Sequence, residues 1–227
     1  MKKPKIGIDL IPIHFRRKAP GTARHVEEQA RALFKMDLPW QWVPVIAPSK
    51  QTLYREISSL HPHILSVNKR SIYATLQIGR AWCSAGCSLG FCTAYFVPAG
   101  NFPIVTNFFD GHILQDNKDG WHRRHHLFPY LLMYGLFRYS IRRSKRIFID
   151  SKYYRDKLAN LYPDLANNFI VAPCGTLSAR KCPTSSPTWL TLKNKEFFLF
   201  IGTVSDNKNQ KTLLKAWAVL QKKWPEF

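Results

Sequence analysis

Acidic residues are scarce in this chain. Asp and Glu number 14 among 227 residues, against 34 Lys and Arg, so the formal net charge is +20. A shortage of acid this large excludes an acidic, self-solvating chain. It favours partners that carry phosphate: nucleic acid, anionic lipid head groups or phosphorylated substrates.

Long apolar runs are missing as well. The most hydrophobic stretch, LFPYLLMYGLF at 127–137, is too short to span a bilayer and contains Pro129 and Gly135. The opening KIGIDLIPI carries Asp9 and lacks a small-residue cleavage site, so we interpret it as a first strand rather than an export signal. We therefore expect a cytoplasmic protein, with peripheral attachment to the inner face of the membrane left open.

Cysteine is infrequent, and its spacing fits no metal motif. Five cysteines, an odd number, favour a reducing compartment. Cys83, Cys87 and Cys92 match neither zinc nor iron–sulfur spacing, and we expect no carboxylate partner that would make a metal site of His122 and His126. We expect ordinary thiols, no metal site and no cofactor.

Apolar residues are nevertheless plentiful: 45% of the chain is hydrophobic and 14% aromatic, which excludes a disordered protein. Stretches of strand length alternate with stretches of helical spacing, a pattern that predicts an α/β fold with a Rossmann-like parallel sheet and helices on both faces. The expected strands are 5–13, 41–47, 64–68, 93–97, 103–109, 146–150 and 168–175. The expected helices are 23–36, 52–61, 72–90, one beginning after Pro129, and 151–162 with Ser151 as N-cap.

The alternation lapses in a polar, Pro- and Ser-rich segment, which has the composition of a linker. We predict an N-terminal Rossmann-like domain over 1–175, a linker over 176–195, and the first βα unit of a second Rossmann-like domain over 196–227. That second part opens with FFLFIGTVSDNKNQKTLLKAW at 197–217.

The order of these pieces resembles the retaining glycosyltransferases of family 4. The resemblance covers nearly the whole chain and rests on the Gly-containing loop after the first strand, on IFIDSKYYRDKL, on FIVAPCG, which ends at Gly175, and on GTVSDNKNQKTLLKAW. It implies a B-type fold of two Rossmann-like domains. The implied activity is transfer of a sugar, with retention, from a nucleotide-diphosphate donor to a polysaccharide, lipopolysaccharide or lipid-linked acceptor.

The resemblance implies a donor-phosphate site at Gly202, Thr203 and Lys208. Lys208 matches the family's lysine, whereas Asn207 stands where many members have Arg. A fixed ammonium and the amides of the following helix would stabilise charge on the leaving phosphate. The alternative is a solvated lysine on an ordinary βα turn.

On the acceptor side, Gly21, Thr22 and Arg24 match the family's Gly-rich loop, with Ala23 replacing its second glycine. The helix that begins beside Gly21 would point amide donors at the same place. The alternative is a helix N-terminus with an exposed arginine.

The strand-end segment IVTNFFDGH supplies the catalytic candidates. Asp110 matches the family's Asp, but Phe109 occupies its His position, and His112 follows two residues later. His112 either compensates for the lost histidine or is a solvated loop residue.

Basic residues gather around aromatic and aliphatic ones in WHRRHHLFPYLLMYGLFRYSIRRSKR. This mixture fits docking on an anionic membrane surface. A core helix with a solvated basic face is the alternative. The candidates are Arg123, Arg124, Arg142, Arg143, Lys145 and Arg146.

The family's paired-Glu motif does not occur before Phe227. We therefore expect a truncated donor domain and no sugar transfer by these 227 residues alone, with another chain as one source of the missing half. The rival hypothesis is a non-enzymatic basic module that binds nucleic acid or anionic membrane. The sequence carries no nucleic-acid module signature, so nucleic acid is not an expected partner.

Overall fold

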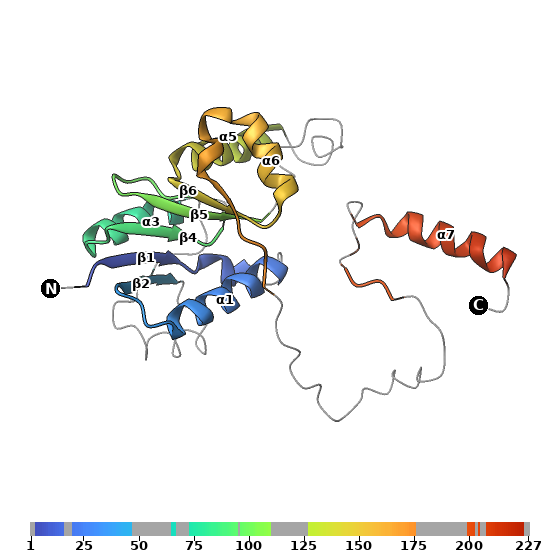
Figure 1. The fold of residues 1–227 in the computed structure, drawn as a ribbon, viewed down its shortest axis with the longest axis horizontal. Helices are drawn as coiled ribbons and strands as arrows, with labels where there is room; N and C mark the ends of the chain where they lie inside the picture. The colour runs from blue at the N-terminus through green and yellow to red at the C-terminus, as the bar shows by residue number, and fades with distance from the viewer. Residues whose placement is uncertain are drawn as a thin grey trace, which may run out of the picture. The chain divides into compact units, whose positions relative to one another are not determined.

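The structure is a computed structural model, and the chain divides into two units, residues 1–175 and 176–227 (Figure 1). The predicted bounds of the domains and of the linker stay predictions. The described residues are 3–15, 20–46, 65–66, 73–94, 96–109, 127–175, 199–202, 204 and 208–224.

A seven-stranded sheet organises the described part of the first unit. Its order is β3-β2-β1-β4-β5-β6-β7, and all six strand pairings are parallel. The predicted α/β class with a Rossmann-like parallel sheet is therefore confirmed. The strands are β1 (Lys5–Asp9), β2 (Gln41–Ile46), β3 (Leu65–Ser66), β4 (Leu89–Cys92), β5 (Ile104–Phe108), β6 (Arg146–Ile149) and β7 (Phe169–Val171).

Helices cover both faces of this sheet (Figure 1). On β5, Ile104 packs with α3 and Phe108 packs with α5 and α6, so these helices share the face of the even-numbered residues. Val105 joins the cluster of α1 on the opposite face. The helices of this unit are α1 (Pro20–Lys35), α3 (Tyr73–Ser84), α5 (Leu127–Arg143) and α6 (Lys152–Leu161), with short 3-10 turns η1 (Ile11–Phe15) and η4 (Pro163–Asn168).

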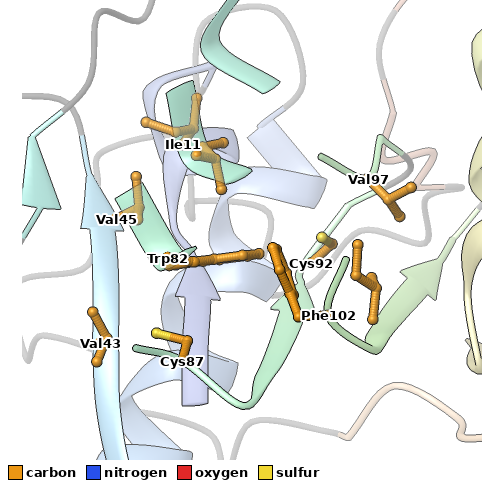
Figure 2. Close-up of a cluster of buried hydrophobic side chains, with 10 residues drawn as sticks. Ile11, Val43, Val45, Trp82, Cys87, Cys92, Val97 and Phe102 are labelled. Atoms are coloured by element: carbon orange, nitrogen blue, oxygen red, sulfur yellow. The ribbon is translucent and has the colours of Figure 1, made fainter. Parts of the chain in front are cut away.

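Trp82 of α3 lies at the centre of one core cluster, fully buried and edge-to-face with Phe102 (Figure 2). Two glycines make room for its indole. Gly7 and Gly90 face each other across β1 and β4, and a Cβ added to either would come within 2.4 Å or 2.6 Å of the Trp82 ring. The strand pair therefore needs glycine at both positions.

Most predicted elements are confirmed within a few residues, and Ser151 caps α6 by accepting a hydrogen bond from the Tyr154 N–H. The strand predicted over 93–97 is wrong. The strand in this region is β4, which lies earlier in the chain. The turn that precedes it falls at Gly86, whose φ is +71°, and Gly90 is part of β4 because this strand packs against Trp82. The first strand also ends earlier than predicted, since η1 follows it, and the helix expected over 52–61 lies outside the described residues.

In the second unit the described structure consists of α7 (Gln210–Lys223) and short segments before it. Residues 199–202 of the predicted FFLFIG strand are not in a strand, because a strand is defined by pairing and the described residues offer them no partner. None of the described residues in this unit is buried. Leu199, Ile201 and Leu214 are 72%, 85% and 66% exposed.

Candidate functional site

The order of the sheet reverses direction between β1 and β4. From β1 the chain proceeds outward to β2 and β3, then returns to β4 and proceeds the other way to β7. In open parallel sheets, ligands bind outside the carboxyl ends of the strands where this reversal occurs. Because α1 follows β1, its first turn lies at this edge.

Residues from three elements lie at this edge, and we name Gly21, His25, Phe109 and Asp150 the carboxyl-end site. His25, in the second turn of α1, packs edge-on against Phe109, just past β5, with ring centroids 4.5 Å apart. One turn further along α1, the Gln29 Oε1 accepts a 2.7 Å hydrogen bond from the Asn107 Nδ2. The amide pair fixes α1 on β5, so the imidazole has a defined position.

His25 and Asp150 make this site electrostatically distinctive. Partial burial lowers the pKa of His25, and the negative charge of Asp150, at the end of β6, acts in the opposite direction. Near neutral pH the imidazole is therefore largely uncharged and offers one ring nitrogen as an acceptor. The Asp150 Oδ1 is buried and has no hydrogen-bond partner among the described residues. The pair can accept hydrogen bonds from a hydroxylated ligand.

The predicted Gly-rich loop is part of a helix. Gly21 and Thr22 lie in the first turn of α1, which begins at Pro20, a position where proline costs no helical hydrogen bond. A Cβ at Gly21 would meet no atom within 4 Å, so space is open above this turn. Thr22 is half-buried and Arg24 is exposed. The described chain thus brings Gly21, Thr22 and Arg24 to the carboxyl edge at the start of α1.

The catalytic candidates Asp110 and His112 lie outside the described residues. Sequence reasoning missed His25 and Asp150, although each offered a signal. Asp150 is a polar residue at the end of the predicted strand 146–150. His25 directly follows Arg24, one of the acceptor-side candidates.

Asp9 ends β1 and is buried on the face of the sheet opposite α1. Burial raises its pKa from 3.8 to about 7, opposed by the Ile11 N–H, which donates a 2.9 Å hydrogen bond to the Asp9 Oδ1. The Thr93 hydroxyl, after β4, donates to the Asp9 carbonyl. These bonds join β1, η1 and β4 where the sheet order reverses, so Asp9 supports the edge on which the site lies.

In the second unit, the structure brings together Gly202 and Lys208, and we name these two residues with the start of α7 the phosphate turn. The Cγ of Lys208 lies 3.9 Å from the position of a Cβ at Gly202. Asn209 caps α7 in the left-handed conformation, with φ of 55°, and its Oδ1 accepts from the Thr212 hydroxyl at 2.7 Å. The exposed Lys208 therefore lies two residues before the first turn of α7, the end of a helix that favours negative charge. Thr203 is outside the described residues.

The predicted membrane-surface residues separate into different environments. Arg143 is half-buried, and its Nη2 donates to the carbonyls of Gly100 and Phe102, so it holds the loop before β5 rather than facing solvent. Arg146 is exposed, and its Nη1 donates to the Asn168 Oδ1 at 3.0 Å. Arg142 and Lys145 are exposed, while Arg123 and Arg124 lie outside the described residues.

The described helices include none that is long and apolar enough to cross a membrane. Within the same residues, no group of three or more His, Cys, Asp or Glu is placed to hold a metal ion, and the four described cysteines, Cys83, Cys87, Cys92 and Cys174, are free thiols. No protein-family model, curated protein or solved structure matches the chain.

Proposed function

We propose that this chain forms the acceptor-binding domain and the first donor-binding turn of a retaining glycosyltransferase that resembles family 4. The observation that carries the proposal is the sheet order, which brings the first turn of α1, Phe109 and Asp150 to one edge. The sequence order of motifs and the contact between Gly202 and Lys208 add support.

The two sites would serve two halves of one reaction. At the phosphate turn, Lys208 and the first amides of α7 would balance the charge that grows on a nucleoside diphosphate as the glycosidic bond breaks. At the carboxyl-end site, a hydroxyl of the acceptor would donate to the neutral His25 or to the Asp150 Oδ1. Acceptors of the glycan or lipid-linked class present such hydroxyls.

The donor half can be tested by calorimetric titration of the 227-residue chain with UDP-, GDP- and dTDP-sugars. Replacing Lys208 by Ala is expected to weaken binding about ten-fold, the effect of losing one charge-assisted hydrogen bond. Lys222→Ala is the matched control, because it removes the same charge at the far end of α7. We expect the control to stay within about two-fold.

Two results would contradict the donor half. One is the absence of binding by every nucleotide sugar in the panel. The other is an equal loss in Lys208→Ala and Lys222→Ala, which would describe the diffuse attraction of a basic chain for phosphate and favour the non-enzymatic binding module.

A further inference from the structure

The solvent-facing side of α5 is unusually apolar for an exposed helix surface. We name Leu131, Leu132, Gly135, Arg138, Tyr139 and Arg142 the outer face of α5, because all six are exposed. The opposite side holds Phe137, Ser140 and Ile141, which are buried in the sheet core. At about 100° per residue, the six exposed positions fall within an arc of roughly 120°.

This outer face combines large apolar groups with positive charge. Leu131, Leu132 and Tyr139 are 55%, 43% and 43% exposed. Arg138 and Arg142 are exposed on the same arc of the helix surface, and none of the 17 residues of α5 is acidic. A surface helix of a globular domain normally places polar residues on this side. Three large exposed groups on one stripe therefore need a partner that accepts both apolar atoms and guanidinium groups.

We propose that the outer face of α5 docks on an anionic phospholipid bilayer. Leucine and tyrosine side chains can enter the boundary between head groups and acyl chains, while the two arginines reach lipid phosphates along their apolar stems. The net charge of +20 attracts the chain to such a surface, and the apolar residues of the outer face determine that α5 contacts the membrane. A purely electrostatic partner such as nucleic acid would leave the leucines exposed.

The hydrogen bonds of the structure identify which arginines are available for docking. Arg143 is held by backbone carbonyls, and Arg146 is bonded to Asn168, so the arginines within the docking stripe are Arg138 and Arg142. Arg138 lies over the Tyr134 ring, with its Cζ 5.8 Å from the centroid, which keeps the guanidinium on the helix surface. The inference does not depend on sugar transfer, because it follows from α5 alone.

Cosedimentation of the 227-residue chain with phospholipid vesicles tests this proposal. We expect binding to phosphatidylcholine vesicles that contain phosphatidylglycerol and little binding to pure phosphatidylcholine. Leu131→Ser with Leu132→Ser, and separately Arg138→Gln with Arg142→Gln, are each expected to weaken binding about ten-fold or more. All four residues are exposed, so the variants keep the core intact, and circular dichroism verifies their folding.

Helix α7 supplies matched controls for both changes. Leu213 and Leu214 are 42% and 66% exposed, and Lys222 and Lys223 occupy its last turn. Leu213→Ser with Leu214→Ser, and Lys222→Gln with Lys223→Gln, should change vesicle binding by less than about two-fold, because neither pair belongs to the outer face of α5. Failure to bind anionic vesicles, or an equal or larger loss in the α7 variants, would overturn the assignment to α5.

Discussion

The two units of this chain treat apolar residues in opposite ways. In the first unit, three clusters of buried side chains hold helices on both faces of the sheet, and Trp82 is fully enclosed. In the second unit, the described residues include none that is buried, and Trp224 is 46% exposed. The carboxyl-end site therefore rests on a packed core, whereas the phosphate turn is positioned by local contacts within a single helix start.

The largest expected effect compares the two tryptophans. Trp82→Ala should lower the free energy of unfolding by about 3–5 kcal/mol, since it empties the space between β1, β4 and α3. Trp224→Ala should change it by less than about 0.5 kcal/mol. Urea denaturation followed by far-ultraviolet circular dichroism measures both. Similar losses in the two variants would mean that the units do not differ as described.

The next effect compares glycines. Gly7→Ala places a Cβ 2.4 Å from the Trp82 ring and should cost roughly 1–3 kcal/mol by overpacking. Gly21→Ala meets open space in α1 and should raise stability by up to about 1 kcal/mol through helix propensity. The same denaturation experiment tests the pair, and a stabilised Gly7→Ala would contradict the packing of Trp82.

Asp9 gives the first unit a pH dependence. The unfolded chain ionises Asp9 near its ordinary pKa of 3.8 and the folded chain near 7, so the folded state binds more protons between these values. Stability should therefore fall by roughly 1 kcal/mol per pH unit as pH rises from about 4 to about 7, and level off above. Asp9→Asn keeps an acceptor for the Ile11 N–H and should remove this slope. A slope unchanged in the variant would assign it to other groups.

The smallest effect compares helix caps. The Ser151 Oγ accepts a 3.4 Å hydrogen bond from the Tyr154 N–H, and Ser151→Ala should cost about 0.5–1 kcal/mol of the first unit's stability. Asn209 caps α7 in the left-handed region, where Asn209→Gly should have an effect of only a few tenths of a kcal/mol. Thermal denaturation of the two variants distinguishes them, and equal shifts would argue against a cap function for Ser151.

Local signals explain which parts of the fold could be predicted. The strand and N-cap around Ser151 are encoded within a few residues, so β6 and α6 follow from the sequence. β4 could not be predicted, because glycine usually marks a turn, and Gly90 is a strand residue here only because the strand packs against Trp82. Propensity cannot anticipate a contact of that kind.

The candidate site shows the same division. Gly21 and Arg24 could be singled out from local pattern, whereas the approach of His25 to Phe109 joins residues 84 positions apart and depends on how α1 lies on β5. Arg143 likewise belongs to a basic run in the sequence, yet its partner Phe102 is 41 residues away. The sequence left His25 without a role and placed Arg143 on a membrane surface, because both roles depend on tertiary neighbours.

The most direct test of the proposed function is mapping of ¹⁵N–¹H chemical shifts on the 227-residue chain. A nucleotide sugar is predicted to shift the amide signals of Gly202, Lys208 and the first turn of α7, and a methyl glycoside offered as acceptor to shift those of Gly21, His25 and Asp150. Two results together would contradict the proposed function. The nucleotide sugar would shift signals evenly over the basic residues, and the glycoside would shift no signal at the carboxyl-end site.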